Sequence, residues 1–189
     1  MKNTILAFTI IFINCHKDNT IKVALNIEND MIIIELFPHK APLTVENFLR
    51  YVDEGRYNDF HFYRVVDLKN QKNDNIKIEV IQGGLGFEKH PMELKPIKHE
   101  TTKKTGILHK NGTISMARLE PGTASSEFFI CIKDQPELNF GGNRNPDGQG
   151  FAAFGQVIKG MDIVKNIQNL DSQDQILEKI IPINIKISN

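Results

Sequence analysis

The side chains that could bind a metal or a nucleotide do not complete a motif in this sequence. Asn143, Asn145 and Asp147, followed by a glycine, have the spacing of the first ligands of a calcium-binding loop. The twelfth position would be Phe154, which cannot supply the bidentate carboxylate, so we interpret the segment as a turn. The six histidines have no paired ligand spacing, and the glycines at 83–86 lack G-x-G-x-x-G. We expect no metal and no cofactor, and we attribute those glycines to backbone turns.

The stretch Asn111–Ile132 organises the rest of the chain. Ile114 and Met116 alternate with polar neighbours, Pro121-Gly122 interrupts the pattern, and an apolar run restarts at Phe128. This pattern predicts two strands joined by a tight polar connection.

The segments before this stretch predict a hairpin followed by a helix. Ile21–Ile27 and Met31–Leu36 are apolar runs, and Asn29-Asp30 between them favours a tight turn. After two prolines, Thr44 is the expected N-cap of an amphipathic helix that should stop at Gly55.

Further short strands are expected along the chain, with one more helix. The strands are 60–66, 77–82, 151–158 and 183–187, and the helix is 161–170. The polar segment Asp67–Asn75 predicts a surface loop, and 86–110 predicts an irregular segment. Many short strands with two flanking helices fit a mainly β protein with a closed barrel.

Four motifs resemble the cyclophilin family of peptidyl-prolyl isomerases. SMAR at 115–118 and SSEFFI at 125–130 are similar to the family's SMA…SQFFI. HFYRVV and VIQGG lie upstream and FAAFGQVIKGMDIVKNI downstream, in the family's order, and the resemblance covers roughly 21–189. It implies an eight-stranded antiparallel barrel capped by two helices, and it makes Asp67–Asn75 an insertion.

The chemistry implied is non-covalent. An X–Pro bond isomerises slowly because amide resonance must be broken at a barrier of about 20 kcal/mol. A site that favours the twisted state lowers this barrier, and a guanidinium can donate to the proline nitrogen, which recovers its lone pair there. By motif match Arg64 occupies the family's catalytic arginine position, and Gln82 matches the glutamine beside it.

The resemblance also assigns substrate-binding positions. Val80, Phe129 and Leu138 match residues that line the proline pocket. Ala117 and Arg118 match the strand that binds substrate main chain, and Thr123 falls in the adjoining loop. Phe62 and Phe128 are neighbours of site positions that we expect in the core.

Five residues depart from the family pattern and bear on catalytic rate and cyclosporin binding. Tyr63 stands where many members have His, Phe151 replaces His or Tyr at the pocket edge, and Glu127 replaces the Gln of SQFF. Glu79 and Glu137 stand at positions where aromatic residues occur. By strand alternation Glu127 should face the pocket beside Phe129, within reach of Arg64.

Length and composition limit the number of domains and the classes of binding partner. The 189 residues suit one domain, and 23 basic against 23 acidic residues give no field that would attract nucleic acid. Cys131 lies in an apolar strand and is expected to be buried. We expect a monomer.

The N-terminus predicts export. Lys2 precedes Ile5–Ile13, an apolar run too short for a membrane span but typical of a signal peptide. Cys15 follows, so 1–15 resembles a lipoprotein signal with the lipid on Cys15, although Asn14 departs from the usual small residue. Residues 16–20 would be a tether, 21–189 the isomerase domain, and the location periplasmic or cell-surface. A plain secretory signal or a disordered start is the alternative.

Two classes of function follow. One is an isomerase acting on proline-containing segments of exported proteins. The other is a weakly catalytic or non-catalytic peptide-binding module or chaperone. Arg64, Gln82 and Phe129 favour the enzyme, because binding alone needs no donor at the proline nitrogen.

Overall fold

The structure is a computed structural model that describes residues 20–188. The predicted signal peptide 1–15, with Cys15, and residues 16–19 of the predicted tether lie outside the described residues. In chain order the described elements are β1 (Ile21–Ile27), β2 (Asp30–Leu36), α1 (Pro42–Asp53), β3 (His61–Val66), β4 (Val80–Gly84), α2 (Thr102–Thr105), β5 (Thr113–Met116), β6 (Phe128–Cys131), the 3-10 helix η1 (Pro136–Leu138), β7 (Ala152–Lys159), α3 (Met161–Gln168), β8 (Ser172–Gln173), β9 (Ile176–Pro182) and β10 (Asn184–Ser188). Within 20–188, no helix has the length and apolar character needed to span a membrane.

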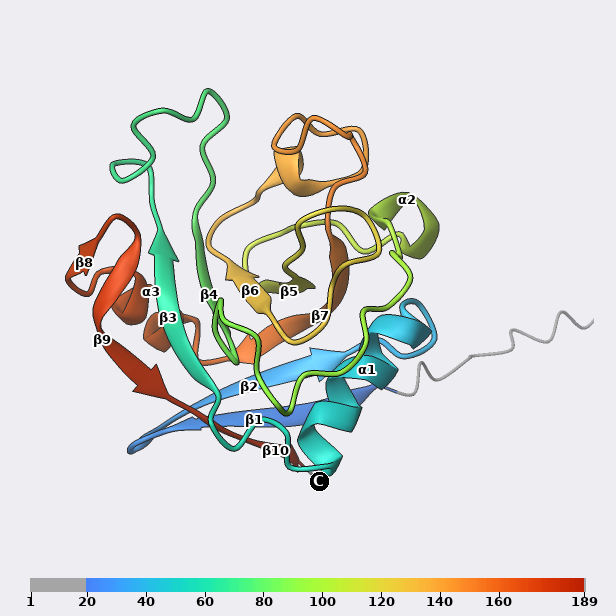
Figure 1. Ribbon diagram of the computed structural model, residues 1–189, viewed down its shortest axis with the longest axis vertical. Coiled ribbons are helices and arrows are strands. Elements are labelled where there is room, and N and C mark those ends of the chain that lie inside the picture. Colours follow the sequence, from blue (N-terminus) through green and yellow to red (C-terminus); the bar gives the residue numbers. More distant parts are fainter. Residues whose placement is uncertain (1–19, 189) are drawn as a thin grey trace, which may run out of the picture.

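The strands form one antiparallel sheet that does not close. The order is β10-β1-β2-β7-β5-β6-β4-β3-β9-β8, and the two end strands, β10 and β8, do not pair in the described chain. The mainly β fold is as expected, but the closed eight-stranded barrel is not confirmed. The C-terminal segment supplies additional strands: β8 and β9 form a hairpin beside β3, and the chain then continues as β10 beside β1. In Figure 1 this segment runs from β8 and β9 at the left of the view to β10 at the bottom, beside β1.

Residues 20–188 contain three α-helices where two were expected. α1 and α3 are the predicted helices, and α2 is one turn within the segment predicted to be irregular. Such a short helix has no apolar periodicity to detect, and it ends at Gly106, whose φ is 71°.

Helix α1 begins before Thr44, so the predicted N-cap is wrong. Ala41 is the N-cap and Pro42 lies in the first turn. The backbone N–H and the hydroxyl of Thr44 donate to the Glu100 carboxylate at 2.9 and 2.8 Å. A residue distant in sequence thus satisfies the helix start, and Gly55, with φ of 64°, follows its end as predicted.

Alternation along the central strands separates a core face from an outer face. On β6, Phe128 and Ile130 belong to the main hydrophobic core, and Phe129 and Cys131 belong to a second cluster. The members of the second cluster are Val66, Ile78, Val80, Phe129, Cys131 and Leu138. Two hydrophobic clusters therefore share these strands, and the smaller one lies on the outer face.

A bulge in β3 places two neighbouring side chains on that outer face. Arg64 pairs with Gln82 and Phe62 pairs with the next residue of β4, so Tyr63 is the extra residue. Phe62 and Val65 enter the main core, and Tyr63 and Arg64 both contact Gln82. A regular strand would have pointed Tyr63 and Arg64 to opposite faces.

Two long connections stand at one end of the molecule. One joins β3 to β4 and contains the insertion Asp67–Asn75, and the other joins η1 to β7 (Figure 1). They touch through Arg144, which forms an ion pair with Asp74 at 3.2 Å. The insertion is ordered by its own hydrogen bonds, including two from Gln71 Nε2 to the carbonyls of Asp67 and Ile78.

Candidate active site

A pocket of about 540 Å³ opens on the outer face of β4 and β6. All but one of the predicted site residues line it: Arg64, Val80, Gln82, Ala117, Arg118, Thr123, Glu127, Phe129, Leu138 and Phe151. The exception is Tyr63, which is 4% exposed and lies behind the wall, in contact with Gln82 and Glu127. Residues predicted from separate motifs thus meet in one cavity.

Arg64 is held between two glutamine side chains. Its Nη1 donates to Gln82 Oε1 at 2.8 Å, and its Nε donates to Gln175 Oε1 at 3.1 Å, with Nη2 bonded to the same oxygen. A guanidinium has five N–H groups, and the remaining two have no acceptor among residues 20–188. Burial lowers the pKa of Arg64, but an arginine remains charged at ordinary pH.

A hydrogen-bonded chain continues from Gln82 to Glu127. Gln82 Nε2 donates to the Tyr63 hydroxyl at 2.8 Å, and that hydroxyl donates to Glu127 Oε2 at 2.6 Å. Because the Tyr63 proton points to the carboxylate, Tyr63 accepts from the amide nitrogen of Gln82 and leaves the amide oxygen for Arg64. Burial, followed by the Glu127 charge, raises the pKa of Tyr63 and keeps it protonated.

Glu127 does not contact Arg64, so the predicted reach between these two side chains is wrong. Besides Tyr63, its carboxylate accepts hydrogen bonds from the backbone N–H groups of Leu85 and Gly86 at 2.8 and 3.1 Å. Ser126 Oγ donates to it at 3.1 Å. Strand alternation correctly predicted that Glu127 faces the pocket. Its carboxylate is bonded to donors that lie nearer than Arg64. Burial raises the pKa of the Glu127 carboxyl.

The apolar end of the pocket is built on Phe129. The Phe151 ring meets it edge-on, with centroids 5.3 Å apart, and Leu138 and Val80 are buried beside it. His109, which the sequence did not single out, lies parallel to Phe129 at 6.0 Å. It bonds to other residues through both ring nitrogens, and burial lowers its pKa to about 4, so it is a neutral support for the wall.

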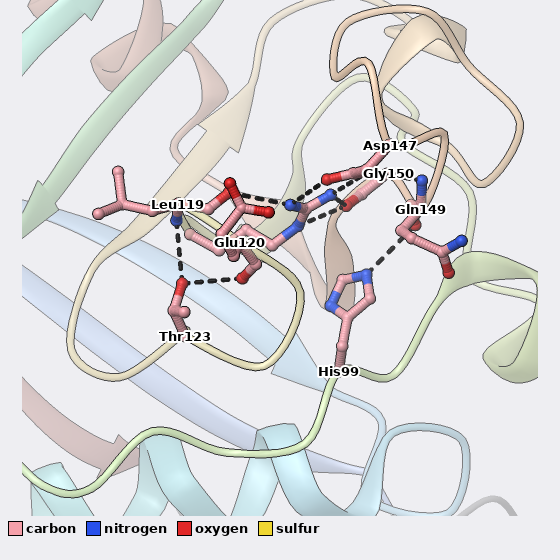
Figure 2. Close-up of polar contacts among 8 residues, drawn as sticks. His99, Leu119, Glu120, Thr123, Asp147, Gln149 and Gly150 are labelled. Carbon is pink, nitrogen blue, oxygen red and sulfur yellow. Dashed lines mark hydrogen bonds and ion pairs between the residues drawn. The ribbon is translucent and has the colours of Figure 1, made fainter.

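Arg118 lines the pocket but its side chain is fully engaged within the protein. Two N–H groups pair with the Asp147 carboxylate at 2.7 and 2.9 Å, and others donate to the carbonyls of Gly150 and Leu119 (Figure 2). All five donors are therefore occupied. The guanidinium also lies 5.2 Å from the Phe151 ring. Arg118 thus holds the η1–β7 connection beside the pocket, and none of its guanidinium N–H groups is left for a ligand.

Thr123 and Ala117 occupy the connection between β5 and β6, which is longer than the tight turn predicted. The Thr123 hydroxyl donates to the Glu120 carbonyl at 2.8 Å and accepts from the Leu119 N–H at 3.1 Å (Figure 2). The N–H of Ala117 donates to the Glu127 carbonyl at 2.8 Å. These bonds shape the rim of the pocket.

The two other departures from the family pattern lie away from the pocket. Glu79 pairs with Lys133 at 3.0 Å, and Glu137 accepts two hydrogen bonds from Asn143. Ile78 lines the pocket beside Val80 instead. Ile78 and Val80 both line the pocket and Glu79 between them does not, which fits alternation along an extended segment.

Two glycines attributed to turns are strand residues of β4. A Cβ on Gly83 would lie 2.7 Å from the His61 carbonyl oxygen, and a Cβ on Gly84 would fall on the Glu127 carboxylate. The backbone contact requires glycine at position 83, whereas a side chain at position 84 would displace the Glu127 carboxylate. The turn interpretation holds for Gly86, whose φ is 103°.

Comparison with known proteins identifies the family. Residues 21–188 match the family model described as cyclophilin type peptidyl-prolyl cis-trans isomerase/CLD. The chain belongs to the cyclophilin family. It is 37% identical to peptidyl-prolyl cis-trans isomerase B of Escherichia coli over 164 residues, covering 79% of this chain and 92% of the relative. It is 38% identical over 152 residues to the isomerase cyp18 of Streptomyces antibioticus, covering 78% and 83%.

Solved cyclophilins share the fold. A Cryptosporidium parvum cyclophilin superposes with a TM-score of 0.69 at 24% identity, covering 90% of this chain and 98% of the other. Together with the relatives, the family assigns this cyclophilin as a peptidyl-prolyl cis-trans isomerase.

Replacing Glu127 with Gln is expected to change how stability depends on pH. Because the pKa of the Glu127 carboxyl is raised in the folded state, its contribution to stability is full below the ordinary Glu range and is lost as pH rises through the raised pKa. Gln does not titrate. The unfolding free energy of Glu127→Gln minus that of the unmodified protein should therefore increase across this window. Urea unfolding at a series of pH values measures it.

The matched variant Glu137→Gln should show the opposite change of the stability difference with pH. Hydrogen bonds from Asn143 lower the pKa of Glu137, so its contribution is lost as pH falls through that pKa. For Glu137→Gln the same difference should therefore decrease with rising pH. Isomerase activity of Glu127→Gln should be kept, because Tyr63 and Gln82 separate Glu127 from Arg64. A pH-independent difference for Glu127→Gln contradicts the assigned shift.

Proposed function

We propose that this cyclophilin isomerises X–Pro bonds without covalent chemistry, with Arg64 as the catalytic residue. The observation that carries the proposal is a guanidinium at the wall of the pocket with two N–H groups unused by residues 20–188. One can donate to the proline nitrogen as the amide twists, and the other to the proline carbonyl. These bonds are stronger in the twisted state than in either planar state, which is the condition for catalysis.

The outer-face hydrophobic cluster is the proposed seat of the proline ring. Phe129, Leu138 and Val80 present an apolar surface beside Arg64, and Phe151 closes one edge. Burial of the ring fixes the X–Pro bond against the guanidinium. A Cryptosporidium parvum cyclophilin with TM-score 0.66 was crystallised in the presence of the dipeptide Ala-Pro, which supports a proline-containing ligand for this fold.

The test is the rate of cis-to-trans conversion of a short prolyl peptide, with and without the protein. The enzyme should accelerate conversion in proportion to its concentration. Peptide binding without acceleration would favour the peptide-binding module or chaperone instead. The bond between Arg64 and Gln82 favours the enzyme, since binding alone does not need an oriented guanidinium.

We further propose that the clients of this isomerase are exported proteins. Support comes from the signal-like apolar run Ile5–Ile13 and the following Cys15. Mass spectrometry of the mature protein tests this: a lipid-modified Cys15 at the N-terminus supports anchoring, and an intact Met1 end rejects export by this signal.

A further inference from the structure

Gln175 occupies a backbone position that disfavours it. It is the second residue of the two-residue turn between β8 and β9, where Gln173 pairs with Ile176. Both turn residues have positive φ, 48° for Asp174 and 73° for Gln175. Tight hairpin turns of this kind favour Asn-Gly or Asp-Gly, so glycine is the residue with the least backbone strain at position 175. A side chain kept at a strained position points to a use for that side chain.

The Gln175 side chain bridges Arg64 and the insertion. Its Oε1 accepts from Arg64 Nε at 3.1 Å and from Nη2, and its Nε2 donates to the Asn70 carbonyl at 3.1 Å. Because the Asn70 carbonyl can only accept, it turns the amide so that the oxygen faces Arg64. The backbone carbonyl of Gln175 also accepts from the Val65 N–H at 2.8 Å, which docks the turn against β3.

The insertion keeps the Asn70 carbonyl in place. Asn70 Nδ2 donates to the Val65 carbonyl at 3.0 Å, and Asn70 Oδ1 accepts from the Asp67 N–H at 3.0 Å. The two side-chain amides that bind Arg64 are each oriented by a second hydrogen bond. Gln82 donates to the Tyr63 hydroxyl, and Gln175 donates to the Asn70 carbonyl. Without Gln175, the Nε and Nη2 side of the guanidinium would have no protein acceptor within residues 20–188.

We propose that Gln175 is a positioning residue for Arg64, holding the guanidinium in the plane from which it donates to the substrate. This inference rests on the proposed role of Arg64. It adds to Gln82 a second support that comes from a segment 111 positions away in the sequence.

The turn allows a clean test. Gln175→Gly removes the side chain at a position whose φ favours glycine, so the fold should be kept or stabilised. Asp174→Gly is the matched control, because it makes the same change at the adjacent turn residue, whose side chain has no bond to Arg64. We expect kcat/KM to fall about tenfold in Gln175→Gly, mainly through kcat, and to stay unchanged in Asp174→Gly.

A spectroscopic readout separates positioning from general stability. The ¹H–¹⁵N signal of the Arg64 Nε–H can be assigned by its loss in Arg64→Lys. The hydrogen-exchange rate of this group with solvent should rise in Gln175→Gly and stay unchanged in Asp174→Gly. Gln175→Asn, which tolerates positive φ but is one methylene shorter, should behave like Gln175→Gly.

The outcomes are distinct. Full activity in Gln175→Gly, or an equal loss in Asp174→Gly, overturns the positioning role while Arg64→Ala still reports on the proposed function. Full activity in folded Arg64→Ala removes the proposed function itself, and with it the basis for this inference.

Discussion

Replacing Arg64 with Ala is expected to lower kcat/KM for a prolyl peptide by about 100-fold or more, the scale seen when a preorganised donor to a transition state is removed. The reason is that Gln82 orients the Arg64 guanidinium beside the apolar cluster, and two of its N–H groups have no acceptor among residues 20–188. Arg64→Lys should also be severely impaired, because an ammonium lacks the planar fork that engages two glutamines and a substrate together.

Protease-coupled or NMR exchange measurements on a prolyl peptide give kcat/KM, and circular dichroism gives the folded fraction. Arg50→Ala is the matched control, since Arg50 is an exposed arginine of α1 paired with Glu54. It should leave both quantities unchanged. Activity near that of the unmodified protein in folded Arg64→Ala would reject the assignment of Arg64 as the catalytic residue.

Local chemistry and family resemblance together located most of the site. The first hairpin and helices α1 and α3 follow from apolar periodicity and turn residues, which are local signals. Phe128 and Phe129 were assigned to core and pocket correctly, because alternation on β6 is regular.

What escaped prediction depends on contacts between distant segments. Whether Glu127 would reach Arg64 depended on where Tyr63 and the Leu85 and Gly86 N–H groups lie, and no local pattern gives those positions. The bulge that brings Tyr63 and Arg64 to one face is a register shift between β3 and β4, invisible in either strand alone.

The strand number of the sheet and the contact between Gln175 and Arg64 also depend on distant segments, so the sequence did not predict them. No strand was predicted in the segment 172–182, yet its second half pairs with β3 as β9, so the sequence-based expectation had too few strands. Gln175 then reaches Arg64 only because that hairpin exists. Arg118 was placed at the site by motif position, and no pattern in the sequence indicated that four of its five side-chain hydrogen bonds go to Asp147 and Gly150 in the η1–β7 connection.

Replacing Phe128 with Ala is expected to destabilise the protein by about 3–5 kcal/mol, the usual cost of truncating a buried Phe. Phe128 has no exposed surface, and its ring lies within 6.4 Å, centroid to centroid, of four others: Phe48, Tyr57, Phe60 and Phe62. Because most domains have a stability of only about 5–15 kcal/mol, this loss should strongly reduce the folded fraction on mild heating.

The adjacent Phe129→Ala variant should show the reverse balance between stability and activity. Phe129 is also buried, but it belongs to the outer cluster and borders an open pocket, so its removal leaves the main core packed. We expect a smaller loss of unfolding free energy than for Phe128→Ala, and a larger fall in kcat/KM per folded molecule, because the proline ring loses its main apolar contact. Urea unfolding and isomerase assays on both variants measure the two quantities. If Phe129→Ala were the less stable variant and kept its activity, the assignment of the two faces of β6 to core and pocket would be wrong, since adjacent residues on one strand can differ this way only through the face they occupy.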